Sequence, residues 1–560
     1  MNLNFEYDEI PDYNEMKKDP SFFSDAYIYF TRGGYWCIFI ENVLNIIVTL
    51  STLIFLMFVF FFLDWDAIAQ CDSEATCSSV DTYIITPAIF HSSPTSGFMI
   101  LFLIMFFIYW ISISAGLVMD MFKFLKYRIY FKSKLGINAD ELKVLSWSDV
   151  VRKMITADNT LSPEIIVGSI MKKDNYLIAM ISSNVFKMNP IFYTNTFLWL
   201  VNVCILNQIF PKNTTILIVT FSDYEKIKKI LKLLGVIQII LLPFTFTIMF
   251  VHYAINFTTN IYTQKTIGPK EWTLYGKFLF REYNELPHIF NDRLRKSYKY
   301  ALQYEQKFNV HMTNIIIEKF TFLFGTYLTF LILIWFYDDR FVMYIKLFDR
   351  DLLWYIAILT SIISVLRLMT VSPSTVDESS EEIIHKMTKY THYFPNRWNG
   401  KCHQHDVYNE IMSLYKYKIM GIFLELLSVI VLPFYMIFKI SDSTETIARF
   451  IERNTTYNNS IGYICKHSLI SDIGSLGMSS VDNESIEMGT FSISVAGSSN
   501  ESTSLIETDK RERSTRNFLS YYSGIPISIT TLNRSLESTN TTTTTDSSLN
   551  ENKKTLLSDN

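Results

Sequence analysis

Long uncharged hydrophobic runs dominate the pattern of this chain. Residues 43–63 and 98–118 contain no Asp, Glu, Lys or Arg. Each run supplies the ~20 apolar residues that a helix needs to cross about 30 Å of hydrocarbon. Two further runs are shorter or carry one charge, Arg367. The pattern therefore predicts four transmembrane helices, at about 38–63, 98–118, 320–336 and 352–371.

Two other apolar runs have a proline inside them, at about 233–255 around Pro243 and at about 419–440 around Pro433. Proline removes a backbone donor and interrupts the hydrogen bonds of a helix. The freed backbone groups must face protein or water rather than lipid. We predict that both runs are re-entrant helical hairpins with the two prolines as hinges, although length alone also permits six complete spans.

The distribution of Lys and Arg favours the re-entrant interpretation. If both runs crossed, the basic stretches 256–319 and 372–418 would lie outside the cytoplasm, against the positive-inside rule. If both return, every basic stretch is cytoplasmic, and the loop 64–97, which has no Lys or Arg, is lumenal. Cys71 and Cys77 share that loop. A disulfide is permitted there, and both the bridged and the free state stay open.

The chain divides into three parts on this topology. Residues 1–35 form a cytoplasmic N-terminal segment, and residues 36–470 form a membrane core with cytoplasmic amphipathic helices between 123 and 231. From 471 to 560 the composition turns to Ser, Thr and Asn. Such a segment cannot bury enough apolar surface to offset its ordering entropy, so we expect a disordered cytoplasmic tail. The predicted class is an all-α integral membrane protein.

Composition supports a membrane protein and excludes several functions. Of the 560 residues, 49% are hydrophobic and 19% are charged, with a net charge of −4. The chain has no excess of basic residues of the kind that accompanies nucleic-acid binding. Cys402 with His403 and His405 is a weak metal pattern, and we expect no metal site. Walker A, GxSxG, HExxH and GxGxxG motifs are absent, so we expect no cofactor and no enzymatic activity.

Two features place charge at the membrane. An arginine inside a span costs at least ~2.5–3.5 kcal/mol on insertion scales. Arg367 therefore either extends to the head groups or faces a polar cavity, and we favour the cavity. Residues 277–288 are dense in both charge signs directly after the first predicted hairpin. They form either a salt-bridged cytoplasmic helix or a polar lining beside the membrane.

The stretch REYNELPH at 281–288 closely resembles the REFNELPH signature of the autophagy-related protein nine family. Further blocks agree with that family in the same order, and together they cover about residues 25–470. These blocks are WC at 36–37, SWSDVV at 146–151, KDNYLIA at 173–179, WTLYG at 272–276, KYTHY at 389–393, LSVIVLPF at 427–434 and GYIC at 462–465.

The resemblance implies four spans, two re-entrant helices, two cytoplasmic termini and a domain-swapped homotrimer. It also implies a protein that moves phospholipids between leaflets without ATP, on Golgi- and endosome-derived cytoplasmic vesicles at the phagophore assembly site (the preautophagosomal structure). Lipid-transfer and other autophagy proteins would be its partners. The charge pattern reaches the topology independently, whereas trimer, scrambling and autophagy rest on the resemblance. The two terminal regions match nothing in the family, so the resemblance implies no adaptor sorting or kinase binding for them.

We hypothesise that a polar path carries lipid head groups, which lose water in hydrocarbon at a cost of many kcal/mol. Cations along such a path contact phosphate, and carboxylates contact ammonium groups or hold the cations in place. The two alternatives are a channel or solute transporter, and a membrane scaffold that recruits the autophagy machinery. The residues that we expect to line the path are Arg367, Lys265, Lys270, Arg281, Glu282, Glu285 and His288.

Overall fold

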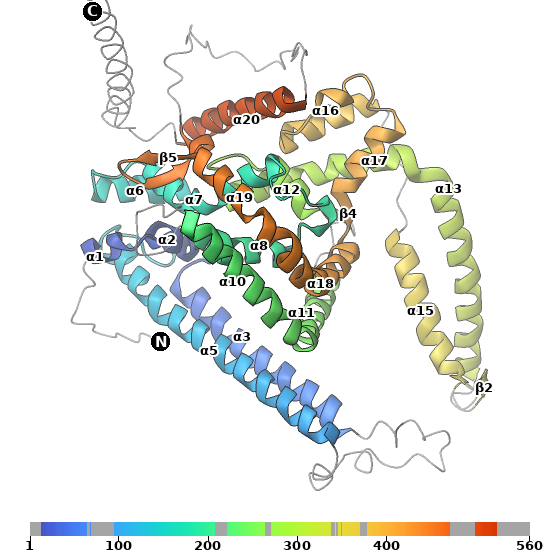
Figure 1. Cartoon of the computed structure of the whole chain (residues 1–560). Coiled ribbons are helices and arrows are strands. Elements are labelled where there is room, and N and C mark those ends of the chain that lie inside the picture. Colours follow the sequence, from blue (N-terminus) through green and yellow to red (C-terminus); the bar gives the residue numbers. More distant parts are fainter. Residues whose placement is uncertain are drawn as a thin grey trace, which may run out of the picture.

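The computed structural model describes residues 13–63, 68, 94–207, 221–263, 270–337, 342, 345–348, 350–369, 378–470 and 499–522. Figure 1 shows long helices that extend downward from a layer of shorter helices. The described part contains three small antiparallel sheets of two strands each. The predicted helical class with several apolar helices is therefore confirmed.

The first two long helices lie side by side. α3 (Tyr35–Met57) continues into a π-helical turn (Phe58–Phe62), and α5 (Pro94–Ser133) returns along it. The Asn42 side-chain amide donates to the Leu117 carbonyl at 3.2 Å, and the Trp110 indole donates to the Ile46 carbonyl at 3.4 Å. These polar groups are paired between the helices, as an apolar surrounding requires.

A second pair forms a hairpin at the opposite side of the molecule (Figure 1). α13 (Pro287–Tyr337) has 51 residues, and α15 (Leu352–Met369) returns along it after the short strands β2 (Lys346–Leu347) and β3 (Arg350–Asp351). Many apolar side chains of this hairpin are bare in the single chain; Phe330 is 62% and Phe336 is 81% exposed. Lipid or another protein surface must cover them.

The chain bends sharply at the first proline. α10 (Phe221–Ile240) and α11 (Leu242–Thr263) meet at an angle of 73°. Pro243 lies in the first turn of α11, where its missing N–H has no helical partner to lose. A bend of this size fits a broken span as well as a re-entrant hairpin, so re-entry stays a prediction here.

At the second proline the chain remains helical, and re-entry there stays a prediction. α18 (Lys418–Tyr435) contains Pro433, then passes through a π-helical turn (Met436–Ile440) into α19 (Ser441–Arg453) without a break. The π-helical turn begins three residues after Pro433, at Met436.

Length and composition would let four helical stretches cross a membrane, or five if the bent pair α10–α11 counts as one span. Two of them, on α3 and α5, overlap the predicted first and second spans, and a third lies on α13. The fourth coincides with the second predicted hairpin, whereas α15 has a shorter apolar stretch than the other spans. The four stretches are Tyr35–Phe55, Leu103–Ser133, Asn314–Tyr337 and Lys418–Arg453.

A close helix crossing holds α10 against the helix that follows Pro433. A Cβ atom added at Gly235 would lie 2.6 Å from Ile437 Cγ1 and 3.1 Å from the Pro433 carbonyl oxygen. Real Cβ atoms do not approach other atoms this closely. Only glycine therefore lets the two backbones meet at this point.

The short-helix layer packs around buried aromatic residues, among them Trp147, Trp272 and Trp398, each 1% exposed. Strand β1 (Lys270–Trp272) pairs with β4 (Tyr415–Tyr417), and β5 (Thr455–Asn458) pairs with β6 (Gly462–Cys465). The helices of the layer are α1 (Tyr13–Lys18), α2 (Phe22–Thr31), α6 (Trp147–Ala157), α7 (Pro163–Ser182), α8 (Asn195–Val201), α12 (Leu274–Phe280), α16 (Ser380–Thr391) and α17 (His405–Leu414).

One segment of the predicted disordered tail is a helix instead. α20 (Ser499–Tyr521) lies across the top of the short-helix layer in Figure 1. Phe518 and Tyr522 are 5% and 2% exposed, in the same apolar cluster as Trp147. The composition argument fails for this segment because two aromatic anchors are enough to seat a helix that is otherwise polar.

Candidate functional site

The REYNELPH stretch makes a tight turn between α12 and α13. Asn284 has a positive φ of 56°, a conformation that asparagine tolerates better than most residues. Its backbone N–H donates to Asn175 Oδ1 at 3.0 Å, and its Oδ1 accepts from Asn175 Nδ2 at 2.9 Å. Its own side-chain amide donates to the Ser468 carbonyl at 2.7 Å. The turn is thus tied to α7 and to the segment after β6.

The charges that flank this turn are paired. The Arg281 guanidinium donates to Asp174 Oδ2 at 3.0 Å. Arg293 makes two parallel bonds to Glu285, at 2.8 Å from Nε and 2.7 Å from Nη2. The same guanidinium donates to the Phe280 carbonyl at 2.8 Å. Bidentate arginine–carboxylate pairs of this kind are among the stronger polar contacts in proteins.

Glu282 is the most enclosed carboxylate of the turn, at 2% exposure. His392 Nδ1 lies 2.7 Å from Oε1, the Asn517 amide donates to Oε2 at 2.6 Å, and Arg513 Nε lies 3.5 Å away. Burial by itself would raise the pKa of Glu282. The hydrogen bond and charge of His392, with Arg293 and Asn517, outweigh burial and lower that pKa to about 2. The carboxylate is therefore ionised at neutral pH.

The last residue of the stretch, His288, contacts the N-terminal helix α2. Its Nδ1 lies 2.7 Å from the Tyr27 hydroxyl, which also accepts the His288 backbone N–H at 3.2 Å. Tyr27 packs edge-on against Trp147 with ring centroids 5.0 Å apart. Burial lowers the pKa of His288, although Asp292 opposes the shift. The ring is therefore held in the neutral form.

Three of the sequence blocks that lie far apart in the chain meet at this turn, together with a residue that closely follows a fourth block. The blocks at 146–151, 173–179 and 389–393 contribute Trp147, Asp174 with Asn175, and His392, while Ser468 follows the block at 462–465. We call this assembly the signature core, defined as residues 281–288 with Tyr27, Asp174, Asn175, Arg293 and His392.

The structure brings four of the predicted path residues together, in contacts with other side chains that are buried or partly buried. Arg281, Glu282, Glu285 and His288 all belong to the signature core. Of the two interpretations of the charged stretch, these contacts favour the salt-bridged core over a polar lining.

The other predicted residues lie elsewhere. Lys270 is ion-paired with Glu305 and lies 4.3 Å from the Tyr417 ring centroid. Arg367 is exposed near the end of α15. Its role as a lining residue stays a prediction. Lys265, Cys71 and Cys77 fall outside the described residues.

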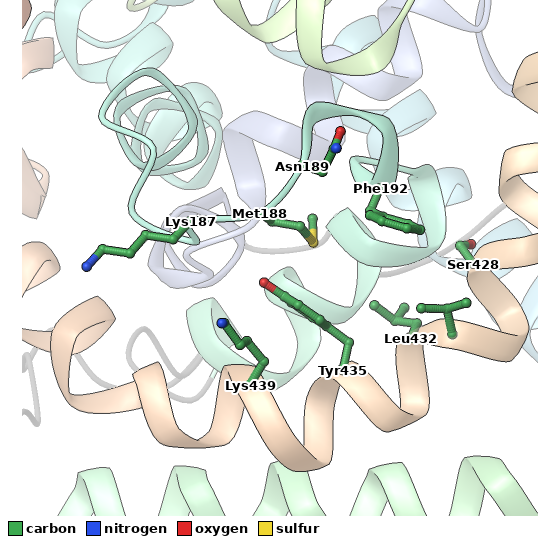
Figure 2. A pocket seen from close by; sticks show the side chains of 9 residues that line it. Lys187, Met188, Asn189, Phe192, Ser428, Leu432, Tyr435 and Lys439 are labelled. Atoms are coloured by element: carbon green, nitrogen blue, oxygen red, sulfur yellow. The ribbon is translucent and has the colours of Figure 1, made fainter.

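A pocket of about 180 Å³ lies beside α18 (Figure 2). Met188, Phe192 and Leu432 give it apolar walls. Lys439 lies beside Tyr435, and the Lys187 side chain points away from the other lining side chains. The Tyr435 hydroxyl borders it and donates to the Phe186 carbonyl at 3.3 Å. The complete lining is Lys187, Met188, Asn189, Phe192, Ser428, Val431, Leu432, Tyr435 and Lys439.

Sequence reasoning missed Glu425, a carboxylate inside the apolar helix α18. It is 7% exposed, and Oε1 accepts the Asn195 backbone N–H at 2.6 Å and the Asn195 side-chain amide at 2.8 Å. Tyr253 of α11 also hydrogen-bonds to it. Glu425 is the single acidic residue in 419–440. A lone charge in an apolar run is the signal that identified Arg367, and it could have identified Glu425. Glu425 joins α8, α11 and α18.

These features define a class of protein. It is a mostly helical membrane protein in which long apolar helices join a layer of short helices whose charged side chains are paired with one another. The sequence profile of the family described as Autophagy protein ATG9 matches residues 13–471. The chain therefore belongs to this family, and it is an autophagy protein.

Relatives from distant organisms support the assignment. The chain is 28% identical to Autophagy-related protein 9 of Dictyostelium discoideum over 481 residues, which cover 82% of this chain and 67% of that protein. It is 29% identical to the Saccharomyces cerevisiae (strain YJM789) protein over 509 residues, which cover 85% and 50%. It thus spans between half and two thirds of the length of these curated relatives.

A solved structure shares the fold. The cryo-EM structure of Schizosaccharomyces pombe Atg9 matches with a TM-score of 0.59 at 22% sequence identity. The match covers 80% of this chain and 98% of that chain.

Proposed function

We propose that this chain is an ATP-independent phospholipid scramblase of autophagosome precursor vesicles. It moves lipids between leaflets so that the phagophore membrane can expand, and it is not an enzyme. Both termini face the cytoplasm, the protein travels on Golgi- and endosome-derived vesicles, and lipid-transfer proteins deliver lipid to it. Membership of the autophagy protein family supports the proposal that the chain acts on autophagosome precursor membranes.

The pocket beside α18 is the observation that carries the lipid chemistry. Its apolar wall suits a stretch of acyl chain, and the Lys187 and Lys439 ammonium groups suit a phosphate. Neither lysine is ion-paired with a carboxylate in the part of the chain that the structure describes. A head group held there exchanges part of its hydration for cationic contacts, which reduces the cost of entering the membrane.

Arg367 and the pocket lysines together form the proposed head-group path. The signature core acts on that path indirectly, because its charges are already paired with one another. Its residues fix the start of α13, which leads to the hairpin that carries Arg367. We keep Lys265 and Lys270 as path residues of the same proposal.

The bare α13–α15 hairpin supports the proposed domain-swapped homotrimer. In one chain its apolar side chains face outward, with Phe322 74% and Phe336 81% exposed. Packing of the hairpin against a neighbouring copy would cover them. Mass photometry of the detergent-purified protein is expected to give three subunits, and a monomer at all concentrations would contradict the swap.

Lipid exchange in proteoliposomes tests the function. Vesicles with a fluorescently labelled phospholipid are treated with dithionite, which bleaches only lipid that reaches the outer leaflet. We expect the wild-type protein to expose inner-leaflet label without ATP. Label that stays protected in intact trimers of the wild-type protein would reject scrambling.

Two variants test the path against a matched control. The double variant Lys187→Ala/Lys439→Ala and the single variant Arg367→Leu are each expected to slow exchange at least tenfold, since each removes a charged contact to phosphate. Arg449→Leu removes an exposed arginine of α19 and should leave exchange unchanged. Exchange as fast in all three variants would reject the path, even if the wild-type protein scrambles.

A further inference from the structure

Helix α20 covers the signature core. The Tyr283 backbone N–H donates to Ser514 Oγ at 3.0 Å, and the Asn517 amide donates to the buried Glu282 carboxylate at 2.6 Å. The Arg513 guanidinium donates to the His392 carbonyl at 3.4 Å. The helix therefore binds the same turn that joins the sequence blocks, although it lies more than two hundred residues away in the chain.

The side of α20 that meets the core is well enclosed. Ser514 and Thr515 are 6% and 4% exposed, and Lys510, at 6%, donates to the Leu279 carbonyl at 3.4 Å. Most of these contacts are polar, and α20 is joined to β6 through residues 471–498, outside the described residues. Apart from the aromatic anchors Phe518 and Tyr522, α20 is seated on the core by polar contacts. Such contacts are sensitive to one added charge at the interface.

We propose that Ser514 is a phosphorylation site and that its phosphorylation releases α20 from the signature core. Arg511 and Arg513 precede Ser514 by three residues and one residue, an arrangement that basophilic serine kinases bind in their acidic grooves. The kinase transfers the γ-phosphoryl group of ATP to Ser514 Oγ, ADP leaves, and the hydroxyl proton passes to the kinase base. Because Ser514 is buried in the docked state, the kinase acts on the released helix and traps it.

Electrostatics at the interface sets the direction of the switch. A phosphoserine carries about −1.5 to −2 charges at neutral pH, and next to a carboxylate in a buried interface it disrupts packing. Residue 514 is seated on the turn that holds the ionised Glu282, and its hydroxyl oxygen already accepts the Tyr283 N–H. The added phosphate group has no room in that contact.

The released helix offers the phosphate better partners. In the docked state Arg511 donates to the Leu469 carbonyl at 3.4 Å, and Arg513 contacts His392 and Glu282. Once α20 leaves the core, Arg511 lies three residues from the phosphate on the same helix face and can pair with it. Phosphorylation thus weakens the docked state and stabilises the released one.

In the cell this switch rests on the proposed cytoplasmic position of α20, because ATP must reach the kinase there. The test uses purified full-length protein in detergent, so it does not depend on orientation or on lipid exchange. A failure of the scramblase proposal therefore leaves its result intact.

The first experiment treats the protein with ATP and the catalytic subunit of cAMP-dependent protein kinase. Mass spectrometry is expected to find phosphate on Ser514, and Phe518→Ala, which loosens docking, should be phosphorylated at Ser514 at least fivefold faster. An equal rate in both proteins would contradict the requirement for release, and no phosphate on Ser514 in the Phe518→Ala protein would overturn the site.

The second experiment measures amide hydrogen exchange in matched variants. Ser514→Glu is expected to speed exchange of the Tyr283 amide and of residues 510–522 at least tenfold, while α10 and α19 keep their protection. Ser520→Glu places the same charge on an exposed position of α20 and should change exchange less than twofold. If Ser514→Glu behaves like Ser520→Glu, or if Ser514→Ala releases the helix as fully as Ser514→Glu, the charge mechanism is wrong.

Discussion

Replacing Glu282 with glutamine tests whether the signature core depends on a buried charge. Glutamine keeps the size of the side chain and one oxygen acceptor, but it removes the negative charge that faces His392 and Arg513. The Asn517 amide then meets a group that can satisfy fewer donors. We expect the core to open more often without unfolding the rest of the molecule.

The pKa of Glu282 gives the size of this effect. It falls from an ordinary 4.5 to about 2, and one pKa unit corresponds to 1.36 kcal/mol, so the fold favours the carboxylate over a neutral group by about 3 kcal/mol. A depressed pKa of an acid contributes stability above the unfolded value, and that stability is lost as the pH falls toward the folded value. At neutral pH the full contribution is present.

Amide hydrogen exchange at neutral pH measures the loss. The Tyr283 amide of Glu282→Gln should exchange about a hundredfold faster than that of the wild-type protein, since 1.4 kcal/mol is a factor of ten. Glu445→Gln is the matched control, because it breaks an exposed pair with Arg449 that is worth at most ~1 kcal/mol. If the two substitutions change local exchange equally, burial of Glu282 does not carry the stabilisation inferred here.

Three further predictions concern other parts of the fold. Gly235→Leu should separate α10 from the π-helical turn and lower the melting temperature by several degrees, whereas Gly116→Leu, at a glycine of α5 with open space around it, should not. Glu425→Gln should speed amide exchange in α8 at least tenfold, because the charge at the Asn195 N–H is lost. His288, whose pKa burial lowers, resists protonation, so its stability contribution is lost as the pH falls below 6.5; the wild-type melting temperature should therefore fall more between pH 7 and 5 than that of His288→Gln.

The long helices could be predicted because insertion into lipid depends on local composition. An uncharged run at 43–63 or 98–118 needs no partner to become helical in hydrocarbon. α5 covers the second run, and α3 with the π-helical turn after it covers the first as far as Phe62. The effect of Pro433 on its helix could not be predicted from local composition in the same way. Whether a proline reverses a helix depends on its tertiary surroundings, and here the helix continues through Pro433 to a π-helical turn.

The contacts of the signature core were beyond the reach of one sequence. The charges of Arg281 and Glu282 were visible, but their partners Asp174 and His392 lie 107 and 110 residues away. In the sequence, a charged stretch after a membrane helix has the same composition whether its side chains line a cavity or pair with one another inside the protein. Glu425 is different, because a single carboxylate in an apolar run was already sufficient reason to expect a partner.

In the proposed scramblase, α13 links the paired charges of the signature core to the lipid path. The helix starts inside the signature core at Pro287, and its 51 residues have a contour length of about 75 Å at 1.5 Å per residue. It bends between the core and the hairpin (Figure 1). A shift at its first turn is passed along this continuous helix to the hairpin. Loosening Glu282 should thus slow lipid exchange through the placement of Arg367, so Glu282→Gln should add little to the loss already caused by Arg367→Leu. Independent, additive losses in the double variant would mean instead that the signature core meets the lipid directly.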